Sequence, residues 1–219
     1  MRKKVRNNKT ILASILALGC LTAASVGFSS WVIAAQKTDA TSNVNVTVAN
    51  IEDHRFNVKA SSGSTIMLAP STNGQWISGA SEERLDFTFS LTFTTKDGKD
   101  FNFTSLGDQS FDINFSFTNI NTLNINDNAD GKTYIEFPSG TIGTISKSGF
   151  IASGTTDPKS SNVITYNDKL AWGSYFGGQN PSLLTNPEEV DSYIAGLKHL
   201  KDCLKDNATF EIKVNIEKK

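Results

Sequence analysis

Residues 84–94 read RLDFTFSLTFT, and their alternation decides the fold class of this chain. The odd positions from Leu85 to Phe93 are all Leu or Phe, whereas the even positions carry charges or hydroxyl groups. A period of two places one row of side chains on a buried face and the other in water, as in an antiparallel sheet that is covered on one side. The same alternation recurs at residues 43–51, 110–118 and 209–217.

Shorter segments with strand character lie between these four. Bounded by Gly, Pro, Asn, Asp or Ser, they cover residues 56–60, 64–69, 132–137, 141–146 and 162–166. The turn between residues 94 and 101 is expected to be a three-residue loop with Gly98 in a left-handed conformation, because only that register sets Phe93 opposite Phe101.

One helix is predicted near residues 187–205. Asn186 suits the N-cap, Pro187 suits the first helical position, and Glu188 and Glu189 favour the positive end of the helix. An apolar stripe then recurs every three or four residues, at Val190, Tyr193, Ile194, Leu197, Leu200 and Leu204. Such a stripe needs a sheet to cover, so we expect this helix to pack on the strands.

These elements predict an all-β protein. We expect a two-sheet antiparallel sandwich, of jelly-roll or immunoglobulin-like type, with the one packing helix. Residues 43–219 are expected to form a single domain, preceded by a short polar linker at 36–42. We expect strand 208–217 to be central in its sheet, because it has four inward apolar residues and no Pro.

Residues 1–35 have the pattern of an export signal. Five basic residues precede residue 10, and residues 11–35 contain no charge and end in small residues, which favours cleavage after Ala34 or Ala35. An uncleaved membrane anchor is the alternative, because about 20 apolar residues can span a bilayer. With either interpretation the positive-inside rule leaves the rest of the chain outside the cell, secreted or on the cell surface.

The charge of the remaining body excludes some partners. The 219 residues contain 21 basic and 22 acidic side chains, and removal of the basic N-terminal segment leaves 16 against 22, a net charge of −6. Because nucleic-acid binding needs clustered Lys and Arg, we expect no nucleic-acid partner. Contact with a membrane is expected only through residues 11–35, if they are not cleaved.

Residues 126–131, NDNADG, resemble the start of a calcium loop. Asn126, Asn128 and Asp130 would offer oxygens at positions 1, 3 and 5, but Phe137 stands where a bidentate Glu is required. Asn, Asp and Gly are also the residues that a tight turn needs. We therefore expect a turn, with a weak calcium site as the alternative and no other cofactor.

Residues 172–178, WGSYFGG, combine aromatic rings with flexible glycines. Trp172, Tyr175 and Phe176 could form a platform on which a sugar stacks, or they could fold over the core, and packing is the favoured interpretation.

The sequence contains no recognisable catalytic motif. The two His residues belong to no HExxH pattern, and the chain has no Gly-x-Ser-x-Gly elbow. Both His residues are expected to have surface or packing roles, and Cys203, on the predicted helix between Leu200 and Leu204, is expected to be a small apolar side chain. We expect a protein that is not an enzyme.

The strand at residues 43–51 has two interpretations. Val44, Val46 and Val48 form one apolar face, and the polar linker before them would let the strand leave its own domain and pair with a neighbouring subunit. Head-to-tail addition of this kind does not close and gives a filament. The alternative is an ordinary first strand in its own sheet.

A family resemblance covers residues 1–52. The basic start, the long apolar run, Trp31 and the segment Lys37-Thr38-Asp39-Ala40-Thr41 before an alternating strand resemble the TasA/camelysin family of Gram-positive bacteria. This resemblance implies export through a dedicated signal peptidase, a jelly-roll body, and a role in surface fibres and biofilm matrix. Camelysin-like proteins have been described as proteases, but no metal-ligand motif here supports that activity.

The sequence therefore favours an extracellular structural protein, a fibre or matrix subunit that self-assembles through its N-terminal strand. A surface-anchored adhesin or carbohydrate-binding module that uses residues 172–178 is the alternative.

Overall fold

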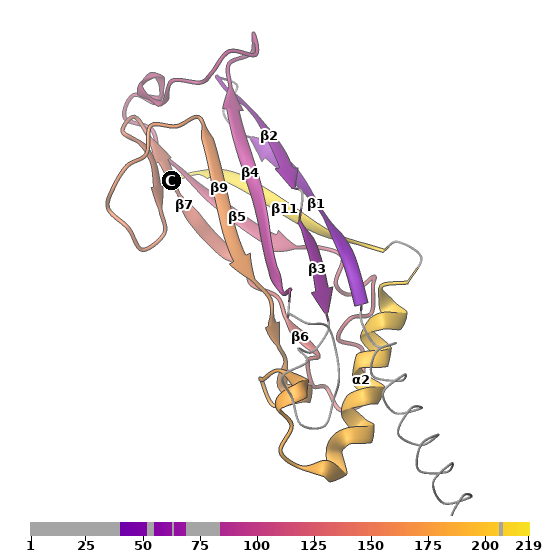
Figure 1. Ribbon diagram of the computed structural model, residues 1–219. Helices are drawn as coiled ribbons and strands as arrows, with labels where there is room; N and C mark the ends of the chain where they lie inside the picture. Colours follow the sequence, from indigo (N-terminus) through magenta and orange to yellow (C-terminus); the bar gives the residue numbers. More distant parts are fainter. Residues whose placement is uncertain (1–39, 52–54, 63, 69–83, 206–207) are drawn as a thin grey trace, which may run out of the picture.

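The computed structural model of the protein describes residues 40–51, 55–62, 64–68, 84–205 and 208–219. The expected export signal, its cleavage sites and most of the linker lie outside these residues. The described part is mostly β, as the alternation predicts. Figure 1 shows the strands stacked in layers, with one long helix at the end of the molecule away from the C-terminus.

The larger sheet has six strands. Its spatial order is β3-β1-β11-β5-β7-β8, which makes β11 central, as predicted. The bounds are β1 Ala40–Ile51, β3 Thr65–Leu68, β5 Phe111–Phe117, β7 Gly140–Ser146, β8 Gly149–Ala152 and β11 Thr209–Lys218.

Two smaller sheets complete the strand set. The three-stranded sheet has the order β2-β4-β9, and a two-stranded ribbon joins β10 to β6. The bounds are β2 Asn57–Ser62, β4 Asp86–Thr94, β9 Val163–Lys169, β6 Ile135–Glu136 and β10 Ala171–Trp172. The decisive segment of the sequence thus becomes β4, the central strand of the second sheet.

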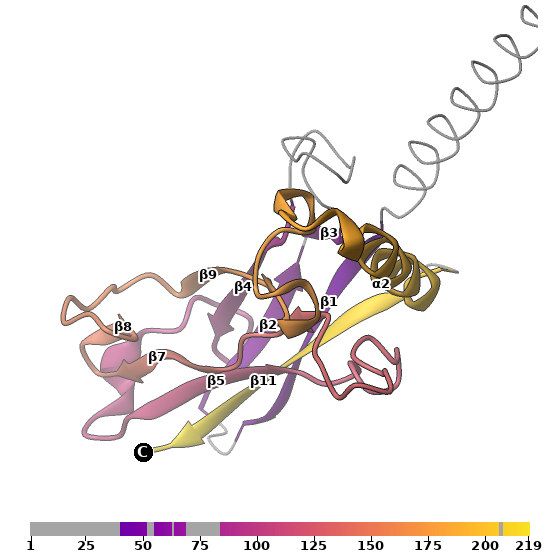
Figure 2. The same ribbon diagram turned by 90° about the horizontal axis from the view of Figure 1, so that it is seen from below.

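The predicted antiparallel sandwich is only partly confirmed. β1 runs parallel to β11, with Val44 beside Phe210 and Val46 beside Ile212, so the larger sheet is mixed. This sheet also curls, as Figure 2 shows, and does not lie flat against the second sheet. Alternation reports which face of a strand is buried but not the direction of its neighbour. No short turn links β1 to β11 to impose an antiparallel pair.

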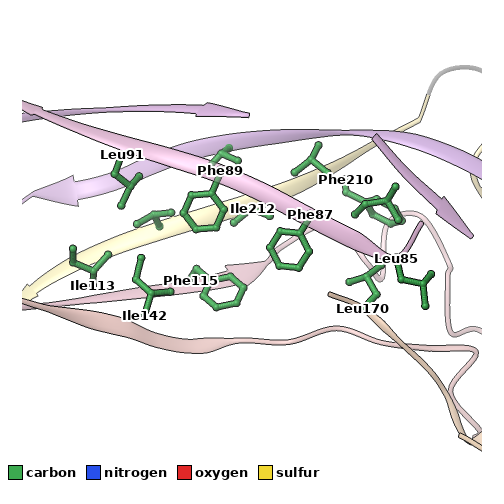
Figure 3. Packing of buried hydrophobic residues seen from close by; sticks show 14 of the residues in the cluster. Leu85, Phe87, Phe89, Leu91, Ile113, Phe115, Ile142, Leu170, Phe210 and Ile212 are labelled. Carbon is green, nitrogen blue, oxygen red and sulfur yellow. The ribbon is translucent and has the colours of Figure 1, made fainter. Parts of the chain in front are cut away.

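The core lies between β4 and the strands β11 and β5. Phe89 and Phe115 are buried with their ring centroids 6.0 Å apart, and Phe87 packs beside them at 6.1 Å from Phe115 (Figure 3). All four inward side chains of β11 are completely buried: Phe210, Ile212, Val214 and Ile216. The predicted faces of these three strands are therefore correct.

The loop after β4 has the predicted register. Thr94 pairs with Asp100, the Phe101 N–H donates to the Phe93 carbonyl at 3.2 Å, and Gly98 has φ +76°. The pairing with β4 stops after Phe101, because Phe103–Leu106 form the 3₁₀ helix η1, capped by the Asn102 side chain. Phe103 still reaches the core, with its ring 5.5 Å from that of Phe93.

The predicted helix is present in two parts. Pro187–Glu189 form a 3₁₀ turn, η4, and Val190–Cys203 form α2. Asn186 is the expected cap, since its side chain accepts from the Glu188 N–H at 3.1 Å. The inward side of α2 is buried at Tyr193, Leu197 and Leu200.

The polar linker is shorter than expected. β1 already begins at Ala40, and Ser42 is buried, with its hydroxyl donating to the Ala208 carbonyl at 2.7 Å. Residues 40–42 therefore belong to the sheet, because β3 offers them a partner through its pairing with Ala40–Asn43.

Replacing Phe89 with Ala should lower the free energy of unfolding by about 3–5 kcal/mol, because the ring is buried among other rings and would leave a cavity. Chemical denaturation measures this loss. Val163→Ala is the matched control: Val163 is exposed on β9, and its loss should change stability by less than about 0.5 kcal/mol. A loss below about 1 kcal/mol at Phe89 would contradict the packing described here.

Deleting residues 208–219 should prevent folding. β11 separates β1 from β5, so its removal opens both neighbours and uncovers the core side of β4. Loss of the cooperative thermal transition in circular dichroism is the expected result. A truncated protein that still melts cooperatively at the original temperature would show that β11 is dispensable.

Candidate functional site

The first strand, β1, is the candidate assembly element, and it is paired unevenly along its two edges. Its inner edge follows β11 in register from Asn43 to Val48, with a further pair at Ile51 after an irregularity. On its outer edge, within the part of the chain that the structure describes, β3 pairs only with Ala40–Asn43. One additional backbone bond joins the Val44 N–H to the Ser64 carbonyl, at 3.2 Å.

The side chains of β1 alternate as predicted. Val44 and Val46 are 7% and 9% exposed and join the core, and Val48 is half-buried against it. Asn43, Asn45 and Thr47 are exposed. In this structure the strand is folded into its own sheet, and its use in assembly stays a prediction.

The aromatic loop packs inward. Trp172 and Phe176 are buried with their rings 5.3 Å apart, and Phe176 also meets Tyr193 of α2 edge-on at 5.3 Å. Tyr175 is half-buried, and its hydroxyl donates to the Ser192 carbonyl at 3.0 Å. Of the three rings in the proposed sugar platform, only Tyr175 therefore presents surface to a ligand.

Gly196 lets α2 approach this loop closely. A Cβ at this position would lie 2.6 Å from Cε1 of Tyr175, 3.0 Å from Cε1 of Tyr134 and 3.1 Å from Cζ of Phe176. The loop, the Tyr134 segment and the helix thus form one aromatic cluster at the end of the sheets.

The Asn126–Gly131 segment is a turn that its own amides hold together. The Asn126 side-chain oxygen accepts from the Tyr134 and Ile135 N–H groups at 2.8 and 3.1 Å. The Asn128 side-chain oxygen accepts from the N–H groups of Asp130 and Lys132 at 3.1 and 3.2 Å. Two of the three oxygens proposed for calcium are therefore engaged by the backbone. This pattern fits the turn interpretation, and the calcium site stays a prediction.

A contact that the sequence analysis missed joins α2 to the turn before this segment. Cys203 and His199 lie four residues apart on α2, with Sγ 3.4 Å from Nε2. Both approach the Asn124 carbonyl oxygen, Nε2 at 3.0 Å and Sγ at 3.4 Å. The i, i+4 spacing was the available signal. Cys203 is therefore more than an apolar filler, since its thiol belongs to a polar contact.

The contact between His199, Cys203 and Asn124 is partly shielded from solvent. Burial raises the pKa of the Cys203 thiol, and the negative charges of Asp202 and Asp127 raise it further. The thiol is thus held in its protonated form, which does not favour a reactive nucleophile. The His199 ring stacks on Tyr134, with centroids 4.7 Å apart and planes 27° from parallel.

A pocket of about 300 Å³ opens beside the same turn. Ile120, Asn121, Asn124, Asn126 and Asp127 line it, so its wall includes the residue whose carbonyl receives His199 and Cys203. Among the described residues, no cluster of three or more His, Cys, Asp or Glu side chains is placed to hold a metal ion. A search of the same residues for membrane spans found no helix of sufficient length and hydrophobicity.

Comparisons with protein families, with curated proteins and with solved structures found no match for this chain.

Gly196→Ala should destabilise the protein by about 1–2 kcal/mol, because crowding against three aromatic rings outweighs the helix propensity gained. Thermal and denaturant melts measure the change. Ala195→Gly, at the exposed neighbouring position, gives the propensity contribution alone, about 1 kcal/mol. A Gly196→Ala variant more stable than the wild type would mean that the rings yield easily.

Proposed function

We propose that this protein is an extracellular structural subunit that assembles through β1 into a fibre or matrix on the surface of a Gram-positive bacterium. The expected export signal, which a signal peptidase would process, supports the extracellular location. The acidic body supports the expectation that nucleic acid is not a partner. The jelly-roll sandwich and the biofilm role implied by the resemblance to TasA/camelysin proteins belong to the same proposal. Non-enzymatic function is part of it.

The observation that carries the assembly step is the position of β1. Val44 and Val46 fill the core beside β11, while the outer edge of the strand beyond Val44 has no ladder partner among the described residues. β1 is also the first described strand, so it can leave without breaking the order of β11, β5 and β7.

The energetics favour exchange over simple loss of the strand. Withdrawing Val44 and Val46 from the core would cost about 1.5–3 kcal/mol for each side chain. If the β1 of a neighbouring subunit fills the vacated place, the same contacts form again, and only the entropy of association opposes the exchange. Each subunit then receives β1 from one neighbour and donates its own β1 to the next. Repeated exchange of this kind extends the polymer head to tail.

Disulfide stapling tests this exchange. Thr47 and Lys213 are exposed partners across the β1–β11 ladder, at a Cα separation that a disulfide accepts. In a Cys20→Ser, Cys203→Ser background, oxidised Thr47→Cys with Lys213→Cys should stay monomeric. The same protein should assemble once the disulfide is reduced, as followed by sedimentation and electron microscopy.

The matched control is Ser116→Cys with Lys213→Cys, which staples β11 to β5 and leaves β1 free. This control should assemble in both redox states. Equal assembly of the two oxidised proteins would contradict strand exchange. If the parent protein forms no polymer over a wide concentration range, the fibre proposal itself fails.

The surface-anchored adhesin or carbohydrate-binding module is the second candidate function. It has weaker support, because Trp172 and Phe176 are buried and Tyr175 alone offers a half-exposed ring. Binding to a panel of cell-wall and host glycans that disappears in Tyr175→Ala would favour it over the structural role.

A further inference from the structure

We propose that His199 and Cys203 form a binding site for a borderline divalent metal ion, zinc being the ion that fits the donor set best. The third donor is the backbone carbonyl oxygen of Asn124, in the turn that packs against α2. This site is separate from β1 and does not depend on the proposed assembly.

The three donor atoms already have the spacing of a coordination face. In a tetrahedral zinc site with the usual bond lengths, sulfur and nitrogen ligands lie about 3.6 Å apart, and nitrogen and oxygen about 3.4 Å apart. Here Sγ to Nε2 is 3.4 Å, Sγ to the Asn124 oxygen is 3.4 Å, and Nε2 to that oxygen is 3.0 Å. An ion could cap this triangle after movements of a few tenths of an ångström.

Without an ion, too many protons compete for one oxygen. The Asn124 carbonyl accepts from the Asp127 N–H at 3.2 Å, from the His199 ring and from the Cys203 thiol. A carbonyl has two lone pairs, so three donors cannot all be well satisfied. Binding of the ion would release the thiol proton to solvent and shift the ring proton from Nε2 to Nδ1, leaving one N–H on the carbonyl.

The ligands are held in place before an ion arrives. His199 and Cys203 share one face of α2 at i, i+4, and Tyr134 stacks on the imidazole and fixes its plane. Asn124 has φ +55°, a left-handed conformation that Asn tolerates better than most residues. Pre-positioned ligands lose little entropy on binding, which favours affinity.

The donor types decide the kind of ion. Thiolate and imidazole favour zinc or copper over calcium and magnesium, which prefer oxygen ligands. The fourth position would be taken by water. Structural zinc sites have four side-chain ligands and catalytic sites have three, so two side chains and one carbonyl should hold an exchangeable ion.

Cobalt titration tests the site directly. The full-length protein, reduced and stripped of metal with a chelator, is titrated with Co²⁺, whose thiolate complexes absorb in the near ultraviolet. We expect a charge-transfer band that saturates at one Co²⁺ per chain and disappears when Zn²⁺ is added. Zn²⁺ should also raise the melting temperature of the protein.

Four variants complete the test, because the chain has only two Cys and two His residues. Cys203→Ser should abolish the band, and Cys203→Ser and His199→Gln should each weaken Zn²⁺ binding more than about tenfold, since even the loss of an outer-shell partner has an effect of that size. Cys20→Ser and His54→Gln should change neither. No band in the wild type, or an undiminished band in Cys203→Ser, would overturn the proposal. Neither result can be explained by a variant that fails to fold.

Discussion

The pairing of β11 with two unlike neighbours is the interaction on which the rest of the structure depends. β11 has β1 on one side, parallel, and β5 on the other, antiparallel. In the strand order, removing it leaves β3-β1 and β5-β7-β8 as separate pieces. Its buried face also meets the rings that β4 directs inward from the second sheet. One strand therefore joins both halves of the larger sheet and supports the core.

The end of the molecule that carries α2 follows from the same strand. α2 precedes β11 in the sequence, and the Ser42 hydroxyl bonds to the Ala208 carbonyl where β11 begins. The start of β1, the start of β11 and the helix end at Cys203 are thus tied together. The aromatic cluster and the His199–Cys203 contact lie at this end, whereas β7 and β8 lie away from it (Figure 2). Both proposals concern residues on or beside elements that β11 holds in place.

Strands and buried faces could be predicted from the sequence because alternation depends on local chemistry. β4, β5 and β11 lie within a residue or two of their expected bounds, and the Gly98 loop has the expected register. Strand direction could not be predicted, since β1 and β11 lie far apart in the sequence and no turn constrains them. The turn held by Asn126 could be predicted from its residue types. The contact between Cys203 and Asn124 could not, because it needs the helix and a distant loop in their folded positions.

The parallel pairing of β1 with β11 has a consequence for the timing of folding. The Ser42–Ala208 bond closes a loop of 166 residues, yet loop entropy grows so slowly that this costs only about 2 kcal/mol more than a loop one tenth as long. The loop therefore has little effect on equilibrium stability. It should lower the folding rate, because such distant contacts form slowly. While the chain is being synthesised, β1 must wait for a partner that is made 166 residues later. The larger sheet can therefore close only after β11 has been made, because β11 joins β1 to β5.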